Sequence, residues 1–337
     1  MRIQENKSLK SFNTFGVDVR AKFFTSVTSV ADLREALRNR PMKNIFILGG
    51  GSNMLLTKDI DAFVIHIAIP GFQILEKNDH SVKITVGGGE KWHDFVMFCV
   101  SQDFGGVENM SLIPGNVGTA PIQNIGAYGA ELKDVFVNCK AIHRETPEER
   151  IFSKEEAQFG YRDSVFKSNL KNEYVITEVT FQLTIRNHQI RTDYGDIQKI
   201  LNERNITNPS IKDVSDAVIS IRQSKLPDPE ELGNSGSFFK NPVVDLETFR
   251  QFKEQFPEAP FYEITPTSFK IPAGWLIEHV GYKGKRVGDA GVHKNQALVL
   301  VNYGQATGKE ILDLALDIQK TVRHKTGIFI EPEVNIF

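Results

Sequence analysis

The segment SLIPGNVGTAPIQNIGAYGAEL, residues 111–132, restricts the possible folds of this chain more than any other feature. Its glycines alternate with prolines and amides inside a connection, 103–131, that is far longer than most loops of compact domains. Glycine permits unusual backbone angles and close approach, proline stiffens the path, and amide side chains offer hydrogen bonds. Such a loop is typical of a binding site, so we expect it to hold a flat, polar ligand.

Two shorter turns have a related design. NIFILGGGSNML (44–55) and VKITVGGG (82–89) are apolar strands that run directly into three glycines. Backbone amides in such a turn can hold phosphate oxygens, but the turn can equally be an ordinary tight turn. Neither fits the dinucleotide fingerprint, which would need glycine in place of Met54 or Trp92, and no GxxxxGK[ST] motif occurs. A Rossmann domain is therefore disfavoured.

Composition narrows the class of protein. With 337 residues the chain is too long for one ordinary core, so we expect two or three domains. A formal net charge of −2 gives no electrostatic basis for binding nucleic acid or an anionic membrane. Cys99 and Cys139 form no CxxC pair and the eight histidines are scattered, so we expect neither disulfides nor a metal. The polar start and the lack of any run of about 18 apolar residues favour a cytoplasmic protein.

Hydrophobic spacing predicts the regular elements. Trp92, Phe95, Val96 and Cys99 recur at i, i+3, i+4 and i+7, which indicates a helix with one buried stripe. The other expected elements are a helix over 29–39, strands over 44–55 and 63–69, mostly strands over 135–190, a helix over 268–281, a long amphipathic helix that ends near Gly327, and a last strand over 328–337.

Six motifs carry a resemblance to a known family. They occur in order and cover nearly the whole chain: ILGGGSNML, IPGNVGTAPIQNIGAYG, FGYRDSVFK, SKLPDPEELGNSGSFFKNP, AGWLIEHVGYKG and EPEV. Each motif alone is weak, but the combination is specific. The chain resembles the UDP-N-acetylenolpyruvoylglucosamine reductases, flavoenzymes that make UDP-N-acetylmuramate for the bacterial wall.

The resemblance implies an α+β fold with an FAD-binding domain of the vanillyl-alcohol-oxidase/PCMH type. The implied divisions are lobe 1 over 1–70, joined by a C-terminal strand over 328–337, lobe 2 over 71–210, and a substrate-binding domain over 211–327. FAD is expected to bind noncovalently between the lobes. The residues expected to contact FAD are Gly49, Gly50, Gly51, Ser52 and Asn53 at the pyrophosphate, and Gly115, Gly118 and Gly126 in the long loop.

The implied reaction is the NADPH-dependent reduction of UDP-N-acetylglucosamine enolpyruvate, a small-molecule substrate, in peptidoglycan precursor synthesis. A hydride from N5 of the reduced flavin adds to the enolpyruvyl group, and negative charge builds on the neighbouring carbon and its carboxylate. Ser237 in GNSGSFFKNP has no histidine near it in the sequence to make it a nucleophile. The resemblance assigns Ser237 as the general acid that donates a proton to this carbanion.

Two charged residues are expected to stabilise that enolate-like intermediate. Arg162 in FGYRDSVFK offers a permanent charge and a planar fork suited to a carboxylate, although a lone arginine can also be a surface partner of Asp163. Glu331 and Glu333 in EPEV lie two apart and point the same way along a strand, so alternation cannot choose between them. The family pattern, which places the catalytic carboxylate directly before the valine, selects Glu333.

Four further residues resemble the family's substrate contacts. Tyr194 in DYGD resembles the lid of a tyrosine-loop subtype, which closes over the nucleotide sugar, but it could also pack locally. Lys225 suits a diphosphate or could be an ordinary exposed lysine, while Asn241 and Gln296 suit uracil, sugar or carboxylate.

We expect a monomer. Two other classes stay open, namely another flavin oxidase or dehydrogenase on the same cofactor domain and a noncatalytic flavin or nucleotide-sugar binding module. The first would keep the glycine loops without a use for Ser237, Arg162 and Glu333 together. The second would need neither a proton donor nor charge stabilisers. Reoxidation of a bound flavin by the enolpyruvyl nucleotide would separate all three classes.

Overall fold

The chain forms two compact units, each assembled from separate stretches of sequence. The computed structural model describes residues 2–337. Unit 1 comprises the described residues up to Lys7, then Ala21–Gly50 and Asp61–Gln223, and unit 2 comprises Ser8–Arg20, Gly51–Ile60 and Ser224–Phe337. None of the helices within residues 2–337 is both long and apolar enough to span a membrane.

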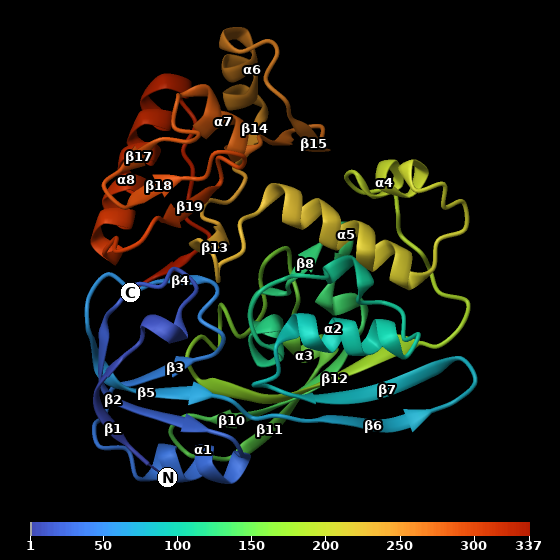
Figure 1. Cartoon of the computed structure of the whole chain (residues 1–337), viewed down its shortest axis with the longest axis vertical. Coiled ribbons are helices and arrows are strands. Elements are labelled where there is room, and N and C mark those ends of the chain that lie inside the picture. Colours follow the sequence, from blue (N-terminus) through green and yellow to red (C-terminus); the bar gives the residue numbers. More distant parts are fainter. Residues whose placement is uncertain (1) are drawn as a thin grey trace. The chain divides into compact units, whose positions relative to one another are not determined.

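A four-stranded sheet with one covering helix forms part of unit 1 (Figure 1). The strand order is β1-β2-β5-β3, with bounds β1 Gln4–Ser8, β2 Arg20–Val27, β5 Ile60–Ile67 and β3 Ile45–Leu48. Helix α1 (Val30–Arg38) begins after Ser29, whose hydroxyl accepts a hydrogen bond at the first turn. Its Leu33 and Leu37 pack with Phe63 in one buried cluster, so the predicted helix is confirmed.

A five-stranded antiparallel sheet forms the larger part of unit 1. The order is β11-β10-β12-β7-β6, with bounds β11 Glu149–Ser153, β10 Phe136–His143, β12 Tyr174–Thr184, β7 Ser81–Gly87 and β6 Phe72–Lys77. Helix α2 (Trp92–Ser101) packs on this sheet (Figure 1). Its predicted stripe is confirmed, because Trp92, Phe95, Val96 and Cys99 are all fully buried.

The long connection after α2 is more ordered than the predicted irregular loop. It contains the 3-10 helices η2 (Glu108–Met110) and η3 (Val117–Gln123), the hairpin β8 (Gly126–Ala127) and β9 (Ala130–Glu131), and is followed by η4 (Leu132–Asp134). The remaining helices of this part of the chain are α3 (Lys154–Ala157), α4 (Ile197–Glu203) and α5 (Ile211–Lys225). The buried hydroxyls of Ser111 and Ser215 lie 2.8 Å apart, which fastens the loop to α5.

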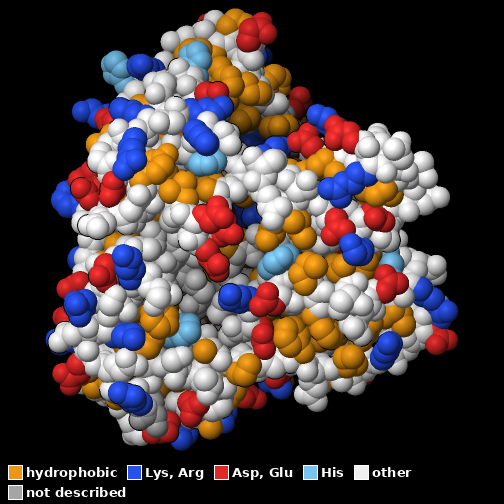
Figure 2. All heavy atoms as spheres, in the orientation of Figure 1, with side chains coloured by type: hydrophobic (Ala, Val, Ile, Leu, Met, Phe, Trp, Pro, Cys, Tyr) orange, Lys and Arg blue, Asp and Glu red, His pale blue; other side chains and the backbone are white. Residues whose placement is uncertain are grey.

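Unit 2 is built on a four-stranded sheet and a smaller three-stranded sheet. The orders are β13-β19-β18-β17 and β14-β16-β15, with bounds β13 Gly233–Ser237, β19 Val299–Asn302, β18 Ala290–Val292, β17 Arg286–Val287, β14 Val243–Asp245, β16 Ser268–Lys270 and β15 Tyr262–Thr265. β4 (Met54–Leu55) pairs in parallel with β20 (Asn335–Ile336). Figure 2 shows hydrophobic side chains gathered over the smaller sheet, where Val243, Tyr262 and Ile264 are exposed.

The helices of unit 2 are η1 (Lys10–Phe12), α6 (Leu246–Gln255), α7 (Ala273–His279) and α8 (Gly308–Thr326). Helix α8 is the predicted long amphipathic helix. Its face carrying Ile311, Leu314 and Ile318 is buried, and it ends at Gly327, whose φ of +72° closes the last turn. This prediction is confirmed.

Two predicted elements are wrong in extent. The helix expected over 268–281 begins only at Ala273, because 268–270 form β16 and Pro272 fixes its own φ and has no amide hydrogen to donate. The last strand expected over 328–337 is reduced to β20. Upstream of β20, Pro332 forms a single isolated bridge with Phe239, since proline cannot donate to a continuous ladder.

Candidate functional site

Both predicted glycine turns meet the long loop inside unit 1. A Cβ added at Gly50 would lie 2.7 Å from the Asn116 side-chain oxygen and 3.0 Å from the Gly115 Cα. One added at Gly118 would lie 2.8 Å from the carbonyl oxygen of Gly88. These spaces exclude any side chain, so the glycines allow three stretches of backbone to lie directly against one another.

The two turns differ in what their amides do. The three amides of 87–89 each donate to a backbone carbonyl of unit 1 at 2.8 Å, so this turn is structural. By contrast, within residues 2–337 no protein acceptor takes the amide hydrogen of Gly49 or Gly50. Backbone N–H groups left available in a glycine turn suit phosphate oxygens. The turn at Gly49 and Gly50 therefore fits the pyrophosphate of a dinucleotide such as FAD.

The rest of that turn belongs to unit 2. A Cβ at Gly51 would collide with the backbone of Phe12, so only glycine fits there as well. Ser52 follows it, and the carbonyl of Asn53 accepts hydrogen bonds from the amide and side chain of Asn335, at 3.2 and 2.9 Å. Asn53 is thus anchored to the end of the chain.

The β8–β9 hairpin requires glycine at position 126, whether or not a cofactor is bound. A Cβ there would lie 2.6 Å from the carbonyl oxygen of Ala130, across the β8–β9 hairpin. The expected contact of Gly126 with FAD stays a prediction, and replacing Gly126 would test the hairpin rather than the cofactor contact. Gly115 has a φ of +109°, a backbone angle that also requires glycine.

Arg162 is hydrogen-bonded to the same hairpin. Its guanidinium donates to the carbonyl oxygens of Gly126 and Asn124, at 2.6 and 3.5 Å, and its own carbonyl accepts from the Lys167 ammonium at 2.8 Å. The backbone of Arg162 has a φ of +54°, which is unusual for a residue with a side chain and is often found at functional sites. The half-buried fork is thus fixed relative to the glycine loop.

Arg222 on α5 is a site residue that the sequence analysis missed. Burial lowers the pKa of its guanidinium, the neighbouring Tyr128 side chain raises that pKa, and the Arg162 charge lowers it. Its Nε is buried and has no acceptor among the described residues. Two adjacent cations with an unused donor suit an anion or a carbonyl oxygen. The signal was its spacing, since Arg222 continues the buried row of Val214 and Val218 at i, i+4 and i+8.

Tyr194 lies in unit 1, in the segment before α4. Its side chain is 63% exposed, and its ring lies perpendicular to that of Tyr128 with the centroids 6.4 Å apart. Exposure favours a surface role over the alternative of burial in a local core. Lys225 is exposed at the last residue of α5 and belongs to unit 2.

Unit 2 brings Ser237 and Glu333 together. Ser237 ends β13 opposite Val299 of β19, directly after Gly236, whose φ is +68°. The amide of Glu333 donates to the carbonyl of Phe238, the residue after Ser237, at 2.8 Å. Both side chains are half-buried, and within residues 2–337 no hydrogen bond involves the Ser237 hydroxyl. An uncommitted hydroxyl beside a carboxylate-bearing segment can deliver a proton to a bound molecule.

Glu331 and Glu333 have different surroundings. Glu331 is exposed, its carbonyl accepts from the Lys240 amide at 2.9 Å, and its carboxylate lies 3.9 Å from the Lys240 ammonium. Glu333 is only partly exposed. The structure therefore favours Glu331 as the solvated acid of the pair.

Asn241 and Gln296 lie at the first turn of α7. The Asn241 side-chain oxygen accepts from the Ala273 amide at 2.9 Å. A Cβ at Gly274 would lie 3.3 Å from the Gln296 side-chain oxygen. The carbonyl of Leu298, near Gln296, accepts from the Phe238 amide at 2.8 Å, so this turn is linked to the strand that carries Ser237. Arg162 and Tyr194 belong to unit 1, and the other predicted catalytic and substrate contacts belong to unit 2.

Two family models match separate parts of the chain. Residues 21–147 match the family model "FAD binding domain", and residues 228–337 match the C-terminal domain of UDP-N-acetylenolpyruvoylglucosamine reductase. A chain with these two parts is an FAD-binding oxidoreductase with an α+β fold, as predicted.

Similarity over the full length gives the family. The chain is 59% identical to the UDP-N-acetylenolpyruvoylglucosamine reductase of Flavobacterium johnsoniae over 100% of both chains. It is 47% identical to the reductase of Pseudomonas putida, over 99% of this chain and 98% of that one. The crystal structure of the Thermus caldophilus reductase has the same fold, with a TM-score of 0.70 at 24% identity over 100% of this chain and 99% of that one. The chain belongs to the UDP-N-acetylenolpyruvoylglucosamine reductase family.

Proposed function

We propose that this protein reduces UDP-N-acetylglucosamine enolpyruvate to UDP-N-acetylmuramate, with NADPH as reductant, in peptidoglycan precursor synthesis. The observation that carries the proposal is the pairing in unit 2 of the segments that hold Ser237 and Glu333, through the 2.8 Å bond from the Glu333 amide to the Phe238 carbonyl. A simple flavin carrier would have no use for a proton donor beside an acid.

Bound FAD would supply the redox chemistry, the transfer of two electrons from NADPH as a hydride to the terminal carbon of the enolpyruvyl ether. The protein must then supply one proton to the neighbouring carbon. Ser237 gives its hydroxyl proton to that carbon, which is basic enough to accept it. The left-handed Gly236 and the fully buried Phe238 flank Ser237 in the chain and fix its backbone.

Arg162 and Glu333 act on the negative charge that develops before the proton arrives. A preorganised donor aimed at developing charge lowers the barrier because it needs no reorganisation during the reaction. The two carbonyl contacts of the Arg162 guanidinium fix its planar fork in advance, and its positive charge stabilises the substrate carboxylate. Glu333 orients that carboxylate from the segment that pairs with Phe238, the residue after Ser237.

The remaining assignments concern the nucleotide and the domains. Tyr194 covers the nucleotide sugar, Lys225 binds the diphosphate, and Asn241 and Gln296 bind polar groups of the substrate. Gly49–Asn53 hold the pyrophosphate of FAD noncovalently, with Gly115, Gly118 and Gly126 against the cofactor. The divisions 1–70 with 328–337, 71–210 and 211–327 correspond to the two FAD lobes and the substrate domain of a cytoplasmic monomer.

A flavin spectrum tests the reaction. The purified protein is expected to carry a visible flavin spectrum that NADPH bleaches and that returns when UDP-N-acetylglucosamine enolpyruvate is added without oxygen. Simple alcohols should have no effect on the oxidised spectrum, which separates this reaction from that of a flavin oxidase. A flavin that NADPH does not bleach, or that the enolpyruvyl nucleotide leaves reduced, would rule the proposal out.

Tyr194→Ala tests the proposed lid. The variant is expected to raise KM for the enolpyruvyl nucleotide about 10-fold, the loss that one aromatic contact would give. Flavin reduction by NADPH should not change, because that step needs no nucleotide sugar. Tyr194→Phe keeps the ring and serves as the matched control for the hydroxyl. An unchanged KM in the alanine variant would show that Tyr194 does not contact the substrate.

A further inference from the structure

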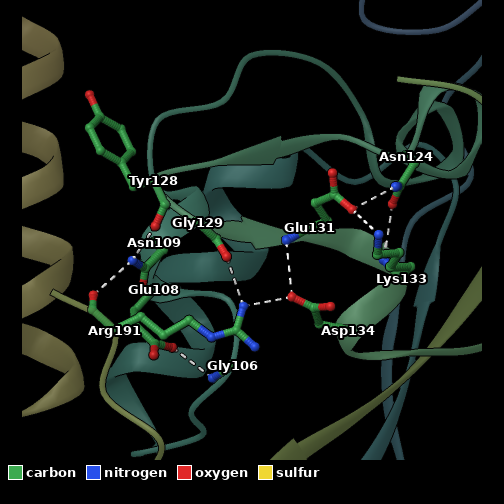
Figure 3. Close-up of polar contacts among 10 residues, drawn as sticks. All are labelled: Gly106, Glu108, Asn109, Asn124, Tyr128, Gly129, Glu131, Lys133, Asp134 and Arg191. Atoms are coloured by element: carbon green, nitrogen blue, oxygen red, sulfur yellow. Dashed lines mark hydrogen bonds and ion pairs between the residues drawn. The ribbon is translucent and has the colours of Figure 1, made fainter. Parts of the chain in front are cut away.

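We propose that Asn109 and Arg191 are positioning residues for Tyr194. Together with Gly129 and Asp134 they form what we name the 109–191 clamp, which fastens the segment 190–196 to the β8–β9 hairpin (Figure 3). The inference rests on the proposed contact of Tyr194 with the nucleotide sugar. It adds a physical link between that contact and the glycine loop, whose carbonyls hold the Arg162 guanidinium.

The Arg191 guanidinium forms one side of the clamp. Its Nη1 donates to the carbonyl of Gly129 at 2.9 Å and to the carboxylate of Asp134 at 2.7 Å. The same Asp134 oxygen accepts from the Glu131 amide at 3.2 Å, as part of the capping box of η4. Arg191 is therefore tied to both ends of the short stretch that follows β8 (Figure 3).

Asn109 forms the other side. It is 2% exposed, and its side-chain Nδ2 donates to two backbone carbonyls, those of Tyr128 at 2.9 Å and of Arg191 at 3.0 Å. An amide nitrogen has two hydrogens, so both donors are used. Loss of either bond would leave a buried carbonyl without this partner, which is costly. Asn109 thus holds the hairpin turn and the Tyr194 segment at one fixed spacing.

The hairpin turn that the clamp holds lies directly against the Tyr194 segment. A Cβ at Gly129 would lie 3.6 Å from the Cβ of Tyr194, and one at Gly195 would lie 3.5 Å from the Tyr128 ring. Tyr128 and Gly129 both have left-handed backbones, with φ of +49° and +82°, and each carbonyl is held by the clamp. Tyr194 is largely exposed, so burial of its ring does not fix its position. Its position depends instead on the hairpin turn at Tyr128 and Gly129, which the clamp holds.

The clamp is better suited to positioning than to stability. The Arg191 side chain is 44% exposed, and exposed ion pairs stabilise folding very little. A change at Arg191 should therefore leave the thermal midpoint nearly unchanged. Its effect should appear instead in the mobility of the segment 190–196 and in the binding of the nucleotide sugar.

The test uses the FAD-bound protein and the variant Arg191→Ala. It is expected to speed amide hydrogen exchange in 190–196 and to raise KM for UDP-N-acetylglucosamine enolpyruvate about 10-fold, because a small displacement of a positioned group is costly. Flavin reduction by NADPH should stay unchanged. Arg191→Lys, which keeps the charge, should restore part of the affinity. Arg186→Ala, which breaks the exposed pair with Asp79, is the matched control and should change neither quantity.

A second variant checks that the ion pair acts as one unit. Asp134→Asn keeps an acceptor for the Glu131 amide and weakens the bond to Arg191. The double variant with Arg191→Ala should raise KM no further than Arg191→Ala alone, as expected for residues that share one interaction. Additive effects would overturn the assignment of the two residues to one clamp.

Unchanged exchange in Arg191→Ala would overturn the proposal, and so would faster exchange with an unchanged KM if Tyr194→Ala does raise KM. If Tyr194→Ala itself leaves KM unchanged, the substrate contact of Tyr194 is wrong and the positioning role falls with it. The exchange measurement still decides whether the clamp holds the segment, because it needs no substrate. The two failures are therefore distinguishable.

Discussion

Replacing Ser237 by alanine is expected to leave the reduction of the flavin by NADPH nearly intact and to slow its reoxidation by the enolpyruvyl nucleotide strongly. Loss of a positioned general acid lowers a rate by about 10²–10⁴-fold, or about 3–5 kcal/mol of barrier. Reduction by NADPH forms no carbanion and does not use this proton. Rapid-mixing kinetics of the two half-reactions measure both effects in one preparation.

The neighbouring Ser235 provides the matched control. Its buried hydroxyl donates to the Met54 carbonyl at 3.2 Å and lies 3.3 Å from the Thr14 hydroxyl, so it is a structural serine of the same strand. Ser235→Ala should lower stability and leave the oxidative half-reaction fast. Ser237→Cys should recover part of the rate, because a thiol is a better acid of similar reach. If Ser237→Ala is reoxidised at the normal rate, Ser237 is not the proton donor.

Replacing Arg162 by lysine is expected to lower the rate of the oxidative half-reaction by about 10²–10³-fold, the usual effect of losing a preorganised donor at developing charge. Lysine keeps the charge but not the planar fork that the Gly126 and Asn124 carbonyls hold in place. KM for the nucleotide should change much less than the rate, because the lost contact matters most in the transition state. Single-turnover kinetics measure the two separately.

Arg150→Lys is the matched control for Arg162→Lys. Arg150 also lies in unit 1, where its guanidinium pairs with Glu156 at 2.9 Å on the surface. This change should affect neither half-reaction. A rate in Arg162→Lys within a factor of about two of the control would show that the fork is not used in the transition state.

The sequence predicts well those elements whose cause is local. The stripe of α2 and the long face of α8 are spacing patterns, and both helices form where the patterns lie. Where a proline intervenes, the local pattern is misleading. Pro272 delays the start of α7, and Pro332 breaks the last strand, although the apolar residues around them fit the expected elements.

The parts of the site that the sequence did not predict depend on distant partners. The turns at 49–51 and 87–89 look alike in sequence, and only the carbonyls that meet the second turn show that its amides are used. Arg222 was missed because its significance comes from Tyr128 and Arg162, which lie far from it in the chain. Glu333 could be chosen over Glu331 by family pattern alone, whereas the structure separates them by exposure.

The chain passes repeatedly between the two units, and this limits how the protein can be divided. Residues 224–337 alone would lack β4, the strand that pairs with β20. They would also lack Leu56 and Phe15, whose backbones pack directly against Gly308 and Gly233, respectively. A fragment that ends at residue 223 would retain 8–20 and 51–60 with their buried residues uncovered. Neither part is a transferable module. Gene fusions and domain exchange between relatives must therefore cut the coding sequence at several matched points rather than at a single linker.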